Sequence, residues 1–164
     1  FRATDSSLRP MGRSTAGVRG MHFRGEDQLL SASVVTDSGY VFVVTEGGYA
    51  KRTGVEHYRV QQRGGIGIKV AKLSETRGAL AGALIVGDED EVLVVLESGK
   101  VVRSGVDEVP AKGRDTMGVV FARMADDDKV LGIAPNSERN LKAVVDEGSV
   151  EAESDNDDHS EVAE

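Results

Sequence analysis

The chain has no cysteine and no tryptophan, and aromatic residues make up only 4% of its 164 residues. The lack of cysteine excludes disulfide bonds and thiolate metal sites. The few aromatic side chains leave little that is able to stack on single-stranded nucleic acid. No apolar run approaches the ~20 residues that a membrane-spanning helix needs, so we expect no membrane partner. Nothing resembles a signal peptide, which predicts a cytoplasmic protein.

Outside the C-terminal segment the chain lacks a net negative charge, although the whole chain has a net charge of −8. Residues 1–124 carry 17 Lys and Arg against 15 Asp and Glu, whereas residues 125–164 carry 3 against 13. The last part of the chain has almost nothing to bury, and its like charges repel one another. We therefore predict a largely disordered acidic tail over residues 136–164. Because the chain begins at Phe1, we expect a piece of a longer protein.

Glycine is abundant, at 20 residues, and the chain contains a repeat of about fifty residues. Residues 1–18, 51–68 and 102–119 align without a gap. Each copy has an arginine, a second arginine eleven positions later and a glycine four positions after that. The three sets are Arg2, Arg13 and Gly17; Arg52, Arg63 and Gly67; and Arg103, Arg114 and Gly118. A period of this length is typical of solenoids and propellers.

Short runs rich in Val, Ile, Leu and Tyr lie between these segments and predict hairpins. The expected strands are residues 28–35, 40–45, 49–53, 79–86, 91–96, 100–104 and 130–134, with one more after each glycine segment at 21–24, 66–73 and 118–124. Gly48 and Gly99 occupy equivalent turn positions, where we expect a positive φ angle. Helix-period spacing is hardly seen outside a turn near residues 136–145.

These features predict an all-β protein, a propeller-like repeat of four-stranded blades that forms part of a ring. We expect the end of an incomplete blade and an inter-blade segment at residues 1–24, followed by a blade at 25–77. A final blade or blades at 78–135 and the tail complete the predicted organisation.

Charge alternates in phase with the repeat. Residues 1–24, 49–77 and 100–123 are net positive, and the residues between them are net negative. Equivalent parts of a radial array fall on equivalent surfaces, so the basic segments should form a band along one rim. Such a band suits the phosphates of a duplex, contacted without reading base sequence. The alternative is a mixed, solvated surface, which is not usually in phase with a structural repeat.

The stretch QQRGGIG, residues 61–67, lacks the Lys-Ser/Thr pair and the following helix of a nucleotide phosphate loop. Two interpretations remain: the glycines let the backbone turn and a phosphate or a neighbouring strand approach closely, with Arg63 supplying the charge, or they form an inter-blade loop without a ligand. No catalytic or metal site is predicted. The three histidines are scattered, residues 126–128 lack calcium-loop spacing, and no serine stands in a nucleophile motif.

The motifs FRATD, RPMGR, GGYAKRT, QQRGGIG, SGKVVR and KGRDTMGV occur in this order across residues 1–135. In these motifs the chain resembles the C-terminal domain of the DNA gyrase A subunit, a β-pinwheel that wraps DNA. The box of that family reads Gln, basic, Arg, Gly, Gly, basic, Gly. Residues 61–67 match it except at Gln62 and Ile66. The full box belongs to the first blade, so the resemblance implies a later-blade copy here.

The resemblance implies a DNA-wrapping module of a type II topoisomerase that introduces negative supercoils with ATP. The implied partners are double-stranded DNA, the rest of the gyrase A subunit, and the gyrase B subunit in an A2B2 heterotetramer, at the chromosome. It implies no cofactor in this part of the protein, since ATP and Mg²⁺ are used elsewhere. It also suggests that the acidic tail competes with DNA for the basic rim.

Two alternatives stay open. One is the equivalent domain of a topoisomerase IV-like A subunit, which wraps DNA little. The other is a propeller-type module that binds proteins. The repeat and the resemblance together predict these DNA-binding residues: Arg2, Arg13, Arg19, Lys51, Arg52, Arg63, Gly64, Gly65, Gly67, Lys69, Arg103, Lys112 and Arg114.

Overall fold

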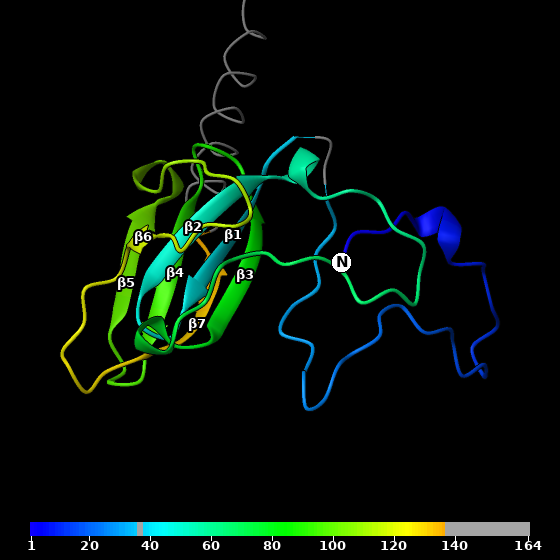
Figure 1. Cartoon of the computed structure of the whole chain (residues 1–164), viewed down its shortest axis with the longest axis horizontal. Helices are drawn as coiled ribbons and strands as arrows, with labels where there is room; N and C mark the ends of the chain where they lie inside the picture. Colours follow the sequence, from blue (N-terminus) through cyan, green and yellow to red (C-terminus); the bar gives the residue numbers. More distant parts are fainter. Residues whose placement is uncertain (36–37, 137–164) are drawn as a thin grey trace, which may run out of the picture.

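The computed structural model describes residues 1–35 and 38–136. Within these residues the strands form two antiparallel sheets, and the helical elements are single 3-10 turns. The turns are η1 (Asp5–Ser7), η2 (Val55–His57), η3 (Glu75–Arg77) and η4 (Val106–Glu108). Figure 1 shows the two sheets packed together, with the N-terminal loop beside them. None of the described segments is a helix long and apolar enough to cross a membrane.

Each sheet is a hairpin whose first strand also pairs with a strand from later in the chain. The four-stranded sheet has the order β3-β1-β2-β6, and the three-stranded sheet has the order β5-β4-β7. The strands are β1 (Tyr40–Thr45), β2 (Tyr49–Gly54), β3 (Leu80–Val86), β4 (Glu91–Leu96), β5 (Val101–Gly105), β6 (Val119–Val120) and β7 (Val130–Pro135). The pairing β1–β3 is thus repeated, about fifty residues later, as β4–β7.

Both hairpin turns depend on glycine, as the sequence predicted. Gly48 has φ 76° and Gly99 has φ 82°, a region in which a side chain is strained. The Gly48 N–H donates to the Thr45 carbonyl at 2.9 Å, and the Gly99 N–H donates to the Leu96 carbonyl at 3.0 Å. Equivalent turns, each with a positive-φ glycine, therefore close both hairpins.

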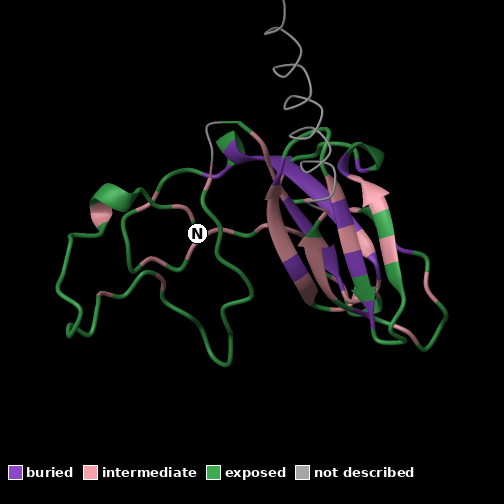
Figure 2. Ribbon diagram, turned by 180° about the vertical axis from the view of Figure 1, so that it is seen from behind, coloured by how far each residue is buried: buried purple, intermediate pink, exposed green. Residues whose placement is uncertain are grey.

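The core lies between the two sheets. Phe42 and Val44 of β1 and Val92 and Val94 of β4 are fully buried in one cluster. Phe121 packs edge-on against Phe42, with ring centroids 5.2 Å apart. Burying a side chain of this size stabilises a fold by ~1.5–3 kcal/mol, so this cluster is the main source of stability. Figure 2 shows burial concentrated in the sheets, whereas the N-terminal loop is largely exposed.

Three predicted strands do not form, and a fourth is short. Residues 21–24, 28–35 and 66–73 are not in strands, and the strand predicted at 118–124 is reduced to β6. A strand needs a partner for its backbone groups. β3, which is equivalent to residues 29–35, has β1 as its partner, whereas none of the described strands pairs with residues 29–35.

The all-β class with repeated antiparallel sheets is confirmed. The predicted domain boundaries stay a prediction, and the four-stranded sheet draws β3 and β6 from beyond residue 77. The turn predicted near residues 136–145 and the acidic tail lie outside the described residues, apart from Asn136.

Candidate nucleic-acid interface

Three arginine-bearing segments, residues 1–22, 51–72 and 102–123, are joined in series by equivalent backbone hydrogen bonds. We call the contact between the first and second segments the first joint and the contact between the second and third segments the second joint. In the first joint, the Gln61 N–H donates to the Arg2 carbonyl at 2.8 Å, and the His22 N–H donates to the Gly65 carbonyl at 2.9 Å. In the second joint, the Lys112 N–H donates to the Arg52 carbonyl and the Lys72 N–H donates to the Thr116 carbonyl, both at 3.0 Å.

These bonds repeat with the sequence period, since each donor and acceptor of the second joint lies 50 or 51 residues after its counterpart. Gly17, Gly67 and Gly118 also share one backbone conformation, with φ of 79°, 79° and 81°. Equivalent residues of successive segments are therefore held in equivalent settings. This regularity is what a continuous basic surface requires.

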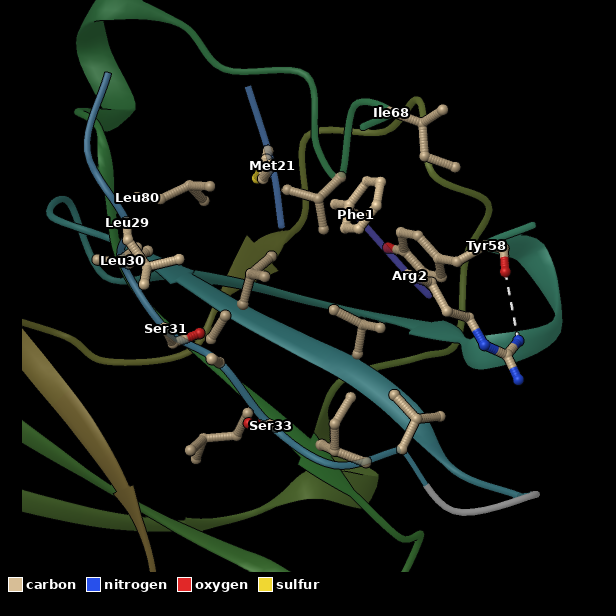
Figure 3. Close-up of a pocket in the computed structure, with 18 of the residues that line it drawn as sticks. Phe1, Arg2, Met21, Leu29, Leu30, Ser31, Ser33, Tyr58, Ile68 and Leu80 are labelled. Atoms are coloured by element: carbon tan, nitrogen blue, oxygen red, sulfur yellow. Dashed lines mark hydrogen bonds between the residues drawn. The ribbon is translucent and has the colours of Figure 1, made fainter. Parts of the chain in front are cut away.

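The first arginine of each repeat is held by acceptors within the protein. Arg2 donates from Nη1 to the carbonyl oxygens of Val55 at 2.9 Å and of Tyr58 at 3.3 Å. Figure 3 shows the Arg2 side chain directed at Tyr58. Arg52 and Arg103 instead make ion pairs with carboxylates, each within its own sheet.

Arg52 is nearly buried, and its Nη1 lies 2.5 Å from Asp88 Oδ1. Arg103 donates from Nε and Nη2 to Glu91 Oε2, at 2.8 and 2.6 Å, across the β4–β5 hairpin. Both arginines lie on the second strand of a hairpin. The Arg52 side chain is only 11% exposed, whereas the Arg103 side chain is 53% exposed and keeps part of its surface open to solvent.

The second arginines lie differently. Arg13 and Arg63 are exposed, and no hydrogen bond or ion pair of their side chains is seen among the described residues. Arg114 is half-buried and donates from Nη1 to the Lys69 carbonyl at 3.2 Å. The second arginine of the repeat is thus exposed in two of the three copies and half-buried in the third.

Three further predicted cations, Arg19, Lys69 and Lys112, have exposed side chains. Lys51 does not, because only 3% of it is exposed. Its Nζ donates to the Val70 carbonyl at 2.6 Å and to the Arg114 carbonyl. Burial lowers the pKa of Lys51 from 10.5 to about 8. Its ammonium group therefore faces protein carbonyls rather than a surface on which a phosphate would lie.

The predicted glycines of residues 61–67 form the first joint. Gly64, with φ 81°, donates its N–H to the Gly20 carbonyl at 2.6 Å. Gly65 and Gly67 lie against Phe1, where an added Cβ would be 3.4 Å from that side chain. These contacts show that the glycines join the second segment to the first. A phosphate contact at Arg63 remains a prediction.

Within the three joined segments, four exposed cations are absent from the predicted DNA-binding set, namely Arg9, Arg59, Lys72 and Arg123, and they too follow the repeat. Arg59 lies fifty residues after Arg9, and Arg123 lies 51 residues after Lys72. All four side chains are exposed. Each of these cations recurs in two of the three segments only, so the period marks them less clearly than the arginine pair and the glycine, which recur in all three.

A cavity of about 740 Å³ opens between the N-terminal loop and β1 (Figure 3). Phe1, Leu29, Tyr58, Ile68 and Leu80 are among its lining residues. Arg2 is the only basic side chain among the described residues that line it, and carbonyls already hold that guanidinium. The chemistry of the cavity is therefore apolar and unsuited to a phosphate.

Among the described residues no group of three or more His, Asp or Glu side chains is placed to hold a metal ion. The part of the chain described here presents exposed cations on repeated segments. Their chemistry is that of binding an anion, with a separate contact for each repeat.

The family model described as "DNA gyrase C-terminal domain, beta-propeller" matches residues 6–36, 39–87 and 90–137. The DNA gyrase A subunit of Streptomyces coelicolor is 53% identical over 150 residues, covering 92% of this chain and 18% of that protein. The DNA gyrase A subunit of Mycobacterium tuberculosis is 47% identical over 140 residues, covering 85% of this chain and 17% of that protein. The chain thus spans less than a fifth of these relatives.

Two solved structures have the same fold. A DNA gyrase A C-terminal domain superposes with a TM-score of 0.71 at 27% identity, covering 79% of this chain and 44% of that one. The C-terminal domain of a DNA topoisomerase IV superposes with a TM-score of 0.75 at 18% identity, covering 88% of this chain and 46% of that one. At that lower identity the second likeness shows the fold alone.

Proposed function

The chain belongs to the DNA gyrase C-terminal domain family, and from this premise we propose that it is a DNA-binding and DNA-wrapping module in the A subunit of a type II topoisomerase. The observation that carries the proposal is the pair of equivalent joints. They place the exposed Arg13 and Arg63 in repeated settings, as a duplex backbone that follows the segments requires.

In this proposal the module contacts the phosphates of duplex DNA that bends easily, and it does not read the base sequence. The described residues contain no helix able to enter a major groove. Cations spaced along a curved surface stabilise a bent duplex because each bend brings further phosphates into contact. In the complete enzyme, the wrapped segment is delivered to a strand-passage gate elsewhere in the same polypeptide.

The proposal includes the partners of the complete enzyme. The rest of the gyrase A subunit, together with the gyrase B subunit in an A2B2 heterotetramer, supplies DNA cleavage and ATP hydrolysis, with Mg²⁺ bound outside this chain. The complex works on the chromosome in the cytoplasm. Support for these partners comes from the gyrase relatives, of which this chain is a small part.

The test of duplex binding is its dependence on salt. If the exposed cations neutralise ~4–6 phosphates, the logarithm of the association constant falls with the logarithm of salt at a slope of about −4 to −5. Fluorescence anisotropy with two unrelated duplexes of equal length measures this slope. Similar slopes for both duplexes support phosphate contact, and a flat response argues for a protein-binding module instead.

Wrapping is tested separately, by relaxing closed circular DNA in the presence of the chain and removing the protein. Trapped supercoils indicate wrapping, and binding without them indicates the topoisomerase IV-like alternative. Gln62 and Ile66 are the observation in favour of that alternative, because they stand where the family's box has cations. Restoring Lys at both positions should then increase the number of trapped supercoils.

A further inference from the structure

Lys51 lies at the centre of the second joint. It is on β2, paired with Val43 of β1, and it is buried among the segments that it contacts. Its Nζ donates to Val70 O, in the second segment, and to Arg114 O, in the third. One side chain therefore links the two segments that carry Lys69 and Arg114.

The contact network around Lys51 closes on itself. Arg114 donates from its guanidinium to the carbonyl of Lys69, the residue before Val70. The Lys51 ammonium thus holds the backbone of Arg114, while the Arg114 side chain holds the backbone beside Val70. Moving either segment breaks contacts in both directions.

The first joint lacks this ammonium group. The residue fifty positions before Lys51 is Phe1, which packs against Gly65 and Gly67. The carbonyl equivalent to that of Val70 is that of Gly20, which accepts from the Gly64 N–H at 2.6 Å. A charged side chain in the second joint thus replaces an apolar contact and a backbone hydrogen bond. The repeat does not require Lys51, so its presence calls for a separate explanation.

Resting on the proposed function, we infer that Lys51 is a positioning residue for duplex binding, which holds the second joint so that Lys69 and Arg114 present their charges to the same stretch of phosphates. Lys51 itself does not touch DNA. It acts through the two carbonyls that it binds. This differs from the role predicted from the sequence, in which Lys51 was a phosphate contact.

Charge near Lys51 makes this role sensitive to pH. Burial and the Arg114 charge lower the pKa of Lys51 to about 8, while the Asp115 carboxylate opposes the shift. On β2 the neighbouring Arg52 points to the opposite face and pairs with Asp88.

Phosphate bound beside Arg114 and Lys69 would favour the charged form of Lys51, so duplex binding would take up a proton near pH 8. A pKa rise of about one unit on binding corresponds to a fall in affinity of about tenfold as pH passes through that range. The neutral amine also gives up the charge-assisted part of both carbonyl contacts.

The experiment measures duplex affinity by anisotropy between pH 7 and 9.5, at several salt concentrations, for the wild-type chain, Lys51→Met, Lys51→Arg and Lys72→Met. At pH 7, Lys51→Met should bind about five- to tenfold more weakly with an unchanged salt slope, because Lys69 and Arg114 still reach the phosphates but the joint must first be ordered for them to do so. The exposed control Lys72→Met should reduce the slope by about one and keep the wild-type pH profile.

The Lys51→Arg variant separates the effect of the positive charge from the effect of losing a proton at high pH. Arginine stays protonated across this range, so the variant should bind at pH 7 like the wild type and lose the fall in affinity near pH 8. It also keeps the test valid if Lys51→Met fails to fold. A wild-type affinity without pH dependence, or a Lys51→Met salt slope reduced like that of Lys72→Met, overturns the inference. Absence of any duplex binding by the wild type overturns the proposed function itself.

Discussion

The Arg52 guanidinium forms an ion pair with the Asp88 carboxylate, with Nη1 2.5 Å from Oδ1, and its Cζ lies 4.7 Å from the centroid of the Tyr40 ring. Arg52 belongs to β2, and Asp88 lies in the turn that follows β3. The pair therefore links two strands on either side of β1 at one end of the sheet. A residue chosen from sequence for its charge thus contributes mainly to the stability of the fold.

Replacing Asp88 by Asn should lower the free energy of unfolding by about 1 kcal/mol, because the Arg52 side chain, 11% exposed, would lose its carboxylate. Urea denaturation measures the change. The control is Glu97→Gln, which breaks the exposed Glu97–Lys129 pair at 3.4 Å and should change stability by less than about 0.5 kcal/mol. Equal effects would contradict a special role for Arg52.

Substituting alanine at the two hairpin glycines should have unequal costs. Both positions have positive φ, which costs alanine about 1 kcal/mol or more. At Gly48 the new Cβ would also collide with the Ala122 carbonyl, whereas nothing lies within 4 Å at Gly99. We expect Gly48→Ala to lose about 3 kcal/mol and Gly99→Ala about 1 kcal/mol in chemical unfolding. A larger loss at Gly99 would mean that the second hairpin is packed differently.

The two arginines of one repeat should respond differently to substitution. Arg63→Gln should weaken binding to any duplex similarly and reduce the salt slope by about one, because Arg63 is exposed. Arg52→Met should lower stability but leave the slope of the folded protein unchanged, since its guanidinium is already paired. Anisotropy titrations at four or more salt concentrations distinguish the two. A reduced slope for Arg52→Met would show that the ion pair opens on DNA.

Tyr58 should ionise late in an alkaline titration. Burial raises the pKa of its phenol above 10.0, against the opposing effects of Thr53 and Arg114. Above pH 10 the folded chain keeps a proton that the unfolded chain has released, so stability should fall as pH rises through this range. Ultraviolet absorbance of tyrosinate follows the ionisation, and Tyr58→Phe should remove its last phase. Loss of an earlier phase instead would show that Tyr58 is not shielded.

The sequence was sufficient to predict those strands and turns that depend only on neighbouring residues in the chain. The runs that form β1 and β4 are each five consecutive apolar residues with one polar residue at an end, and each run is followed by a turn that contains a positive-φ glycine. The period of fifty residues then located the second hairpin from the first. The number of strands in each sheet depended on pairing partners that lie far away in the sequence, and the local residue pattern carries no information about those partners.

Residues 28–35 illustrate the difference, because their composition resembles that of β3 but they form no strand. The candidate site shows the same effect in its arginines. Arg52 and Arg63 are chemically identical, and only the position of Arg52 on β2, facing Asp88, withdraws it from the surface. Side-chain charge was predictable from sequence, whereas its direction depended on the packing of the sheets.

The pairing of β1 with β3 has a consequence for synthesis of the chain. As the ribosome releases residues in order, the β1–β2 hairpin emerges with one side of β1 lacking its neighbour. That side is filled only when Val86 has left the exit tunnel, and β4 must then wait in turn for β7. Each newly made hairpin is therefore briefly exposed to nascent-chain chaperones, and maturation proceeds one repeat behind translation.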